Sequence, residues 1–473
     1  MKKKLILLLL LIGIAYTSVL TTHALTTNFY EGEYIEGIWM NKYNPANRTI
    51  YYQKARFFRH SGTNEFAYCI EPFSFFNDSS TYESTINPYN LSEHQKDRIT
   101  KIAHFGYNYP NHTDVKWYAI TQLMIWQEAD PSGDYYFTNS LNGTRINPYQ
   151  NEINEINNLI NNYNTHPSFN NQTFYQVENK ELIIEDTNNI LNNYTINDQN
   201  IVKENNKLIS KYNKEGEYII TFTRKETIHN KPIIFFQSSN SQNLVETGDL
   251  NDINLSFKII VQKTNITVNK LDKDTQTIKP SGNASLDGAI YSLYDSNDEL
   301  IQELTIENNE SSLDNLNYGK YYLKENKPGE GYNLDKDIHE FEITQEKPYV
   351  LLELYNEVIK ANLIINKQYG EENNFHNEDN ISFNILNSNN EIVDTITTDN
   401  DGNASILLPY GKYTIEQVNT KDGYEKNDII ELTIDSTEDK KIYLKDLKIK
   451  VPNTHTNKIS MLNIIFIIIS ILI

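Results

Sequence analysis

The sequence has little cysteine and little positive charge. Cys69 is its only cysteine, which excludes an internal disulfide and a zinc site made of several cysteines. Lysine and arginine number 42 against 63 aspartate and glutamate residues, and the formal net charge is −21. A chain of this charge repels phosphate backbones, so we expect no nucleic acid among its partners. We predict neither a metal site nor a cofactor.

The N-terminus has the layout of a secretory signal peptide. Lysines at positions 2–4 precede an apolar run over residues 5–20, and the Thr-His-Ala sequence at 22–24 offers a small-residue cleavage site. We therefore predict that residues 1–24 are a signal peptide and that the chain is exported. Exported proteins often gain stability from disulfides, so this chain has to gain it in another way.

The C-terminal segment, residues 451–473, combines a short polar motif with an almost wholly apolar run over 461–473. The motif consists of Val451, Pro452, Asn453 and Thr454. It resembles a Gram-positive cell-wall sorting signal, in which sortase cuts a Leu-Pro-x-Thr-Gly-like motif ahead of an apolar tail. His455 stands where that family has glycine, and the apolar run is shorter than the roughly 20 residues that cross a bilayer core. The resemblance implies anchoring to the cell wall or membrane, with sortase as a partner.

The region from about residue 178 onward predicts strands joined by turns. Short runs that are rich in β-branched and aromatic residues, such as 218–222, 255–261 and 351–355, are separated by asparagine, aspartate and glycine. No helical pattern recurs between them, which favours antiparallel sandwiches over βαβ units. The predicted fold class is mainly β and multidomain, with an α+β head before the sandwiches.

A repeat predicts how the chain is divided. The sequence Tyr-Gly-Lys-Tyr at 318–321 returns at 410–413, 92 positions later, which indicates two tandem domains. Before them, Ser92 is the predicted N-cap of one helix, and residues 117–127 have the apolar spacing of another. We expect the α+β head at 25–176, a β-sandwich spacer at 177–263, and the repeated domains at 264–359 and 360–450.

The first repeat holds a lysine, a glutamate and an asparagine in distinctive segments. Lys270 lies in Val-Asn-Lys-Leu-Asp, Glu325 ends a Gly-x-Tyr-x-Leu-x-Glu pattern, and Asn356 ends Leu-x-Leu-x-Asn. Together these segments resemble the prealbumin-like Cna B-type (SpaA-type) domain of Gram-positive surface proteins. The resemblance implies an amide bond from Lys270 to Asn356, with Glu325 assisting. Burial favours the neutral amine and the protonated acid that this reaction needs; the alternative is a set of ordinary surface charges.

The second repeat departs from this pattern at one position. Lys367 and Asp446 correspond to the lysine and the asparagine, but Gln417 stands at the assisting position. An amide can donate a hydrogen bond to a carbonyl but cannot transfer a proton as a carboxylic acid does. Two outcomes therefore stay open, a slowly formed bond from Lys367 to Asp446 and a buried ion pair.

The single cysteine lies in Tyr-Cys-Ile-Glu-Pro at 68–72, and Gln122 lies in Thr-Gln-Leu-Met-Ile-Trp at 121–126. With residues 102–107, these motifs resemble the thioester domain of Gram-positive surface adhesins. The resemblance implies that the Gln122 side chain acylates Cys69 Sγ with loss of ammonia. Gln127 is a second candidate, but five helical steps turn it to another face. Three aromatic residues flank the proposed bonding residues and form a hypothetical shield against water, namely Phe66, Tyr68 and Trp126.

These observations predict a cell-surface adhesin that captures its partner covalently. A lysine amine of a host or environmental surface protein would open the Cys69–Gln122 thioester, and because this happens once we do not expect an enzyme. The first alternative is a noncovalent adhesin or structural stalk. The second is a secreted transferase in which His104 or His112 activates Cys69, and the third is an inert buried thiol.

The intact mass of the mature chain tests the predicted bonds. Each bond formed from a carboxamide removes one ammonia, and a bond to Asp446 removes one water. We expect a mass lower than the sequence mass by these amounts, with Cys69→Ala and Lys270→Ala each restoring one ammonia. A mass equal to the sequence mass would contradict every one of the bonds.

Overall fold

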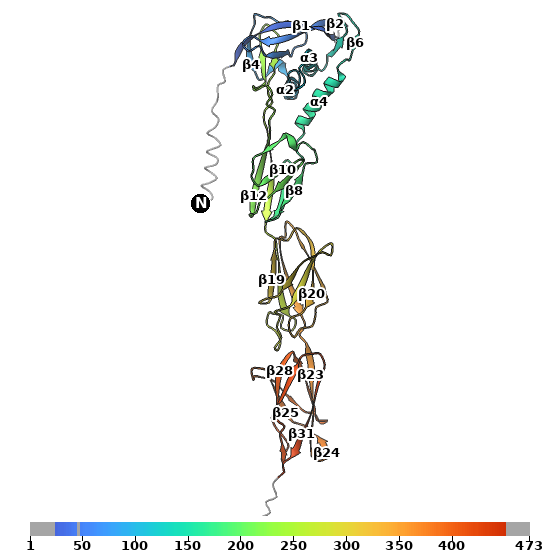
Figure 1. Ribbon diagram of the computed structural model, residues 1–473, viewed down its shortest axis with the longest axis vertical. Helices are drawn as coiled ribbons and strands as arrows, with labels where there is room; N and C mark the ends of the chain where they lie inside the picture. Colours follow the sequence, from blue (N-terminus) through green and yellow to red (C-terminus); the bar gives the residue numbers. More distant parts are fainter. Residues whose placement is uncertain (1–23, 45–47, 451–473) are drawn as a thin grey trace, which may run out of the picture. The chain divides into compact units, whose positions relative to one another are not determined.

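The computed structural model describes residues 24–44 and 48–450 (Figure 1). The predicted sorting-like motif and nearly all of the predicted signal peptide lie outside the described residues. The chain divides into two compact units. The first consists of the residues up to 174 together with 181–212 and 216–260. The second consists of 175–180, 213–215 and the residues from 261 onward. Strands predominate in both, which confirms the predicted fold class. Within the described ranges, no helix is long and apolar enough to cross a membrane.

The first unit is organised around an eight-stranded sheet with the order β2-β3-β14-β13-β4-β1-β5-β6 (Figure 1). β1 also pairs with β2, so the strands from β2 to β1 close into a ring. β3 is apolar over its whole length and largely buried, as expected of a strand inside the domain. The strands are β1 (Thr26–Asn44), β2 (Thr49–His60), β3 (Phe66–Cys69), β4 (Thr81–Thr85), β5 (Asp134–Thr138), β6 (Arg145–Ile146), β13 (Ile234–Gln237) and β14 (Leu244–Glu246).

Three helices, α2 (Glu93–Phe105), α3 (Val115–Ala129) and α4 (Gln150–Asn164), accompany this sheet. The predicted N-cap of α2 is confirmed, because Ser92 accepts a hydrogen bond from the backbone of Gln95 while the Gln95 side chain caps Ser92 in return. α3 packs against both other helices and against β1, β3 and β5, and most of its residues are buried. A helix that is apolar on nearly all sides is typical of a domain interior. A one-turn helix, η1 (Pro88–Asn90), precedes α2.

Strands β13 and β14 come from the region that the sequence assigned to the spacer, residues 177–263. In the structure, β13 pairs with β4 and β14 pairs with β3, so both complete the first sheet. The boundary expected at residue 176 therefore does not follow the sheet. The alternation of apolar and polar residues is the same whichever sheet a strand joins, and only long-range pairing decides between them.

The rest of the expected spacer, together with β7 from the end of the expected head, forms two smaller sheets, with the orders β10-β11-β8 and β7-β15-β12-β9. Phe169, Phe222 and Phe257 meet in ring contacts and are almost fully buried, so these sheets have an aromatic core. The elements are β7 (Thr173–Val177), β8 (Leu182–Glu185), η2 (Leu191–Asn193), β9 (Thr195–Ile196), β10 (Ile201–Glu204), β11 (Lys207–Ser210), β12 (Gly216–Arg224) and β15 (Ile253–Gln262).

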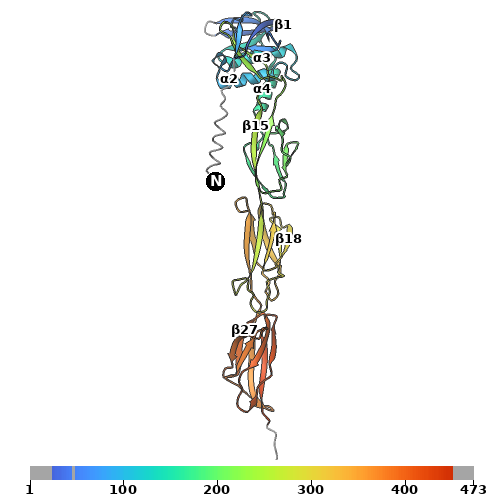
Figure 2. The same ribbon diagram turned by 90° about the vertical axis from the view of Figure 1, so that its left-hand side faces the viewer.

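The second unit contains two sandwiches, in which Figure 2 labels the strands β18 and β27. Each sandwich has its own apolar core. The first has the sheets β19-β16-β22 and β18-β17-β20-β21. Its strands are β16 (Asn265–Asp272), β17 (Ile290–Asp295), β18 (Leu300–Thr305), β19 (Glu310–Asp314), β20 (Gly319–Lys327), β21 (Ile338–Ile343) and β22 (Tyr349–Asn356).

The second sandwich has the sheets β24-β23-β31-β29, with β27 also paired to β23, and β26-β25-β28-β30. Its strands are β23 (Lys360–Glu371), β24 (Asn374–Asn377), β25 (Ser382–Leu386), β26 (Ile392–Thr397), β27 (Asn403–Pro409), β28 (Gly411–Gln417), β29 (Tyr424–Glu425), β30 (Ile430–Ile434) and β31 (Lys440–Lys448). In both sandwiches the first strand pairs with the last in parallel, β16 with β22 and β23 with β31. The predicted antiparallel arrangement holds for the other strand pairs.

Candidate functional site

Cys69 lies at the end of β3, in the interior of the first unit, with 1% of its surface exposed. Gln122 reaches it from α3, as the sequence predicted, but contacts its backbone. The Cys69 N–H donates to Gln122 Oε1 at 2.8 Å, and Gln122 Nε2 donates to the Cys69 carbonyl at 2.7 Å. Both polar atoms of the Gln122 side chain are therefore engaged in holding the end of β3.

A different glutamine reaches the sulfur. Gln242, two residues before β14, has its Oε1 2.5 Å from Cys69 Sγ, and Sγ also lies 2.9 Å from the Glu71 carbonyl. Gln242 was not among the site residues predicted from the sequence. Its only signal there is a glutamine in the polar run over residues 237–243, which without β3 beside it has the pattern of an ordinary turn.

Glu71 fastens the segment that carries Gln242. Its Oε2 accepts a hydrogen bond from the Asn243 backbone at 2.9 Å, and the Ile70 N–H donates to the Asn243 carbonyl at 3.0 Å. Leu244 then pairs with Cys69 in the β14–β3 ladder. Partial burial raises the pKa of Glu71, and the Asn243 N–H that donates to it counters this. Glu71 thus positions Gln242 against the sulfur through its neighbour Asn243.

Aromatic side chains enclose the cysteine. Tyr68 is fully buried and stacks on Tyr118 at 4.7 Å between ring centroids, and Tyr118 donates a hydrogen bond to the Ala67 carbonyl at 2.6 Å. Trp126 is 2% exposed, neighbours the thiol, and contacts the Phe73 ring at 5.2 Å. Of the three residues expected to form a shield, Tyr68 and Trp126 are buried and Phe66 is partly buried. This enclosure keeps the sulfur in an apolar surrounding.

Burial raises the pKa of the Cys69 thiol well above its ordinary value, because a thiolate would lose its hydration there. The thiolate is the reactive form of cysteine in transferases and proteases. Each of the two histidines considered as activating bases is hydrogen-bonded to a backbone carbonyl. His104 Nδ1 lies 2.8 Å from the Gly248 carbonyl, and His112 Nδ1 lies 2.7 Å from the Phe105 carbonyl. This geometry does not favour the transferase interpretation.

The motif at 102–107 serves packing at this site. It includes the C-terminal end of α2, where a Cβ on Gly106 would lie 2.1 Å from Thr121 Oγ1. Only glycine therefore allows α2 to approach α3 so closely at this point. Thr121 Oγ1 accepts a hydrogen bond from the Tyr107 N–H at 3.1 Å, which fixes the turn of α3 that carries Gln122.

The first sandwich brings its three predicted residues together in its core. β16 and β22 pair so that Lys270 faces Leu354, two residues before Asn356. Lys270 Nζ contacts Asn356 Oδ1 and lies 3.3 Å from Glu325 Oε1, and Asn356 Nδ2 donates to the same Glu325 oxygen at 2.9 Å. All three side chains are buried, which rules out the surface-charge interpretation. Burial lowers the pKa of Lys270, favouring its neutral amine.

The second sandwich repeats this arrangement with a different acceptor. Lys367 faces Leu444, two residues before Asp446, and its Nζ contacts Asp446 Oδ1. Gln417 Nε2 donates to Asp446 Oδ2 at 2.6 Å, so the amide occupies the place that Glu325 has in the first sandwich. Lys367 and Asp446 are both fully buried.

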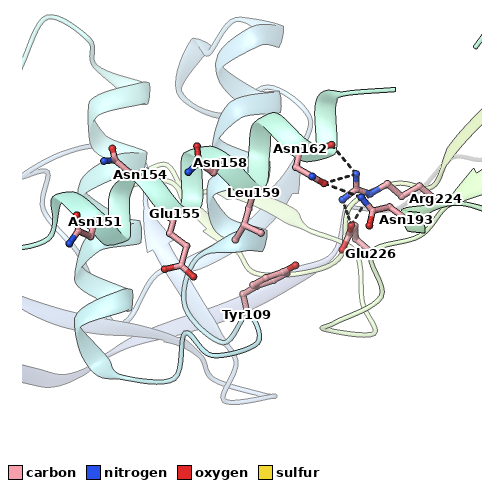
Figure 3. A pocket seen from close by; sticks show the side chains of 10 residues that line it. All are labelled: Tyr109, Asn151, Asn154, Glu155, Asn158, Leu159, Asn162, Asn193, Arg224 and Glu226. Carbon is pink, nitrogen blue, oxygen red and sulfur yellow. Dashed lines mark hydrogen bonds and ion pairs between the residues drawn. The ribbon is translucent and has the colours of Figure 1, made fainter. Parts of the chain in front are cut away.

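A separate hollow of the first unit lies beside α4 (Figure 3). Asn151, Asn154 and Asn158 line it from the helix. Arg224, the last residue of β12, and Glu226 also line the hollow, and they form an ion pair at 2.6 Å. Arg224 also donates a hydrogen bond to the Asn162 carbonyl. Figure 3 shows these contacts at one end of the hollow. Because Arg224 and Glu226 neutralise each other, neither is a reactive group comparable to Cys69.

Comparison with known families gives the same two assignments as the geometry. The family model described as thioester domain matches residues 66–214, and the model described as SpaA, prealbumin-like fold domain, matches 264–358 and 367–448. The chain carries a thioester domain followed by two SpaA-type prealbumin-like domains. The thioester match includes Cys69 and Gln122 but ends before Gln242. None of the curated proteins compared matches the sequence.

Solved structures of similar proteins include a TIE protein, a thioester domain and a fragment of a pilus adhesin. The Bacillus anthracis TIE protein is 19% identical over 90% of this chain and 84% of that chain, with a TM-score of 0.36. The thioester domain of the Staphylococcus aureus TIE protein is 20% identical over 50% of this chain and 99% of its own, with a TM-score of 0.39. A C-terminal fragment of the pilus adhesin SpaC from Lactobacillus rhamnosus GG is 15% identical over 40% and 99%, with a TM-score of 0.30.

Replacing Trp126 with alanine tests whether the aromatic enclosure protects a thioester. The smaller side chain admits water beside Sγ, so we expect faster hydrolysis, followed as gain of one water in the intact mass over time. Trp117→Ala is the matched control, because Trp117 is also a buried tryptophan of α3 but stacks on His112. An unchanged lifetime in Trp126→Ala would remove the shielding role.

Proposed function

We propose that this protein is a cell-surface adhesin whose thioester domain captures a partner covalently. The observation that carries the proposal is the contact between Cys69 Sγ and the Gln242 side chain in a dry, aromatic enclosure. The thioester joins Cys69 to Gln242, in place of the Cys69–Gln122 pair that the sequence predicted. Gln122 holds the Cys69 backbone through its two hydrogen bonds and so keeps Sγ in position.

The bond forms by exchange of a thiol for ammonia. Cys69 Sγ attacks Cδ of Gln242, the new C–S bond replaces the C–N bond, and the thiol proton leaves with the amide nitrogen as ammonia. The attacking and accepting groups are already in contact, and such fixed proximity supplies effective molarities of up to about 10⁵ M or more. Burial raises the pKa of the Cys69 thiol and disfavours its reactive thiolate, so we expect this step to be slow.

Capture reverses the roles of the groups. A lysine amine of the partner attacks the thioester carbonyl, the C–S bond breaks, and the proton from the nitrogen passes to the sulfur. The products are an amide between Gln242 and the partner lysine and a free Cys69 thiol. Because nothing regenerates the thioester, one molecule captures one partner, which is the reason that we do not class the protein as an enzyme.

Methylamine distinguishes the two glutamines. We expect stoichiometric labelling of the peptide that contains Gln242, with release of one titratable thiol, and no labelling in Gln242→Ala. Gln122→Ala should still be labelled at Gln242, but to a lower extent because the end of β3 is held less firmly. Gln127→Ala is the control, since Gln127 donates to the Tyr135 carbonyl and does not touch the cysteine.

Labelling at Gln122 would restore the pairing predicted from the sequence and overturn the choice of Gln242. The absence of any labelling, with a full thiol in the native protein, would leave noncovalent adhesion as the function.

The two prealbumin-like domains form the support of this head. In the first, we propose an amide bond between Lys270 and Asn356, with Glu325 relaying the proton, on the strength of the buried contacts among the three side chains. Such a bond links the first strand of the domain to the last and takes over the stabilising role that disulfides have in other exported proteins.

Glu325→Gln tests this bond without changing the volume of the side chain. We expect no cross-linked peptide between residues 270 and 356, because an amide does not relay protons. The bond closes a loop of 86 residues, so by analogy with a disulfide its loss should lower the free energy of unfolding of this domain by about 4 kcal/mol. Peptide mapping and thermal melting measure the two effects. A cross-link that forms normally in Glu325→Gln would exclude the relay.

The proposed partners follow from this function. The target is a host or environmental surface protein that presents an accessible lysine. Export by the predicted signal peptide and anchoring to the cell wall or membrane through the sorting-like motif, with sortase acting on it, are proposals that rest on the sequence at the two ends of the chain.

A further inference from the structure

The second prealbumin-like domain lacks the acid that the first uses, although its lysine and acceptor are in place. Gln417 occupies the position of Glu325, and both ends of its amide are engaged, Nε2 with Asp446 Oδ2 at 2.6 Å and Oε1 with the Asn427 N–H at 3.1 Å. Gln417 can polarise the acceptor carboxyl, but it has no proton to exchange. An amide bond in this domain therefore requires a proton carrier from another part of the sandwich.

Glu378 reaches the lysine from another element of the sandwich. It directly follows β24, and its backbone N–H donates to the carbonyl of Lys367 at 3.0 Å, which aims its side chain toward the lysine amine. Glu378 Oε2 is 3.8 Å from Lys367 Nζ. Nothing in the sequence singles out Glu378 as a site residue, because it lies outside every motif of the repeat.

The surroundings of Glu378 are unusual for a carboxylate. The residue is 2% exposed, and its Oε2 has no hydrogen-bond partner within the part of the chain that the structure describes. Oε1 accepts only a long hydrogen bond from the Lys421 backbone, at 3.3 Å. A buried carboxylate oxygen without a partner is costly, whereas a protonated carboxyl at the same place is tolerated.

The charges in this core agree with that protonation state. Burial, followed by the charge of Asp446, raises the pKa of Glu378. Burial also lowers the pKa of Lys367, which favours its neutral and nucleophilic amine. Asp446 Oδ2 receives a second hydrogen bond from Thr420 Oγ1 at 2.6 Å, so two donors withdraw electron density from the carboxyl that is to be attacked.

We propose that Glu378 is the catalytic acid of the second prealbumin-like domain and that it enables an amide bond between Lys367 and Asp446. The neutral Lys367 nitrogen attacks Cγ of the Asp446 carboxylate while the protonated Glu378 gives its proton to a carboxylate oxygen. Glu378, now ionised, takes a proton from the attacking nitrogen and passes it to the same oxygen. One C–N bond forms, one C–O bond breaks, and one water leaves. This inference rests on the proposed bond chemistry of the first domain and extends it to a domain whose acid comes from the residues that follow a different strand, β24.

The two domains thus take the acid from different elements. Glu325 belongs to β20, in the sheet that faces β16 and β22, and accepts hydrogen bonds from the asparagine amide. In the second domain, the position of Glu325 is occupied by Gln417, which donates a hydrogen bond but transfers no proton. The proton carrier that we propose there is Glu378, beside the lysine. Polarisation and proton transfer are therefore separate in the second domain and combined in the first.

Peptide mapping of the full chain tests the proposal, with the Lys270–Asn356 bond as an internal reference in every sample. We expect a cross-linked peptide between Lys367 and Asp446 in the natural sequence, one water lighter than its parts. Glu378→Gln keeps the shape and should slow the formation of this bond by about 10²-fold, a typical contribution of general acid–base catalysis. The reference bond should form as before.

A second variant shows whether the lost function is that of an acid. Adding Gln417→Glu to Glu378→Gln returns a carboxyl to the position of Glu325, and we expect the cross-link to form again. Asp446→Asn in the natural background should give a cross-link that is lighter by one ammonia instead of one water, which verifies the acceptor.

Three outcomes would overturn the proposal. The first is that the bond forms normally in Glu378→Gln. The second is that the cross-link does not return in the double variant although this variant melts as a folded protein. The third is that the Lys367–Asp446 peptide is absent in the natural sequence while the reference bond is present. If the reference bond were absent and the Lys367–Asp446 bond present, the proposed chemistry of the first domain would fail and that of Glu378 would stand.

Discussion

The hydrogen-bonded pairing of β14 with β3 is the interaction on which the head depends. It places Leu244 opposite Cys69 and so brings the residue two positions earlier, Gln242, onto the sulfur. Glu71 supports the same pairing through Asn243. Because β14 follows β3 by about 170 positions in the sequence, the site exists only once the whole first sheet has closed around α3. Thioester chemistry in this protein is therefore a property of the folded sheet.

The same constraint governs the two prealbumin-like domains. In each, the first and last strands lie in parallel register, and the acceptor sits two residues beyond the one that faces the lysine. Parallel neighbours can only be joined by a long connection, so the lysine and its acceptor are always far apart in the sequence. The covalent link that we propose between them would close nearly the whole domain. Such a link would suit a chain whose single cysteine excludes disulfides.

Burial directs the chemistry at all three places. It holds the Cys69 thiol in its protonated form and the two lysines, Lys270 and Lys367, toward their neutral forms. In water these groups would be oxidised or charged, and none of the three reactions would be selective. Each proposed reaction would join groups that already touch, so proximity and desolvation would supply much of its acceleration.

Much of this was readable from local patterns. The N-cap at Ser92 and the mainly β fold class were predicted correctly, because each depends on residues within one strand or turn or on a repeated motif. Lys270, Glu325 and Asn356, which the sequence singled out through their motifs, lie buried together. The helical stretch with Gln122 was also predicted, and it does reach Cys69. The family resemblance to a thioester domain and to SpaA-type domains was confirmed by the family models.

The sequence by itself determined which reactive groups the protein has, namely one thiol and two lysines with their acceptors. It also determined the strand patterns that carry these groups. Only the tertiary structure decided which groups meet. It placed Gln242 at the sulfur and Gln122 at the Cys69 backbone, joined β13 and β14 to the first sheet, and placed Glu378 beside Lys367. The physical reason is that strand periodicity specifies which face a side chain occupies but not which distant strand will lie beside it.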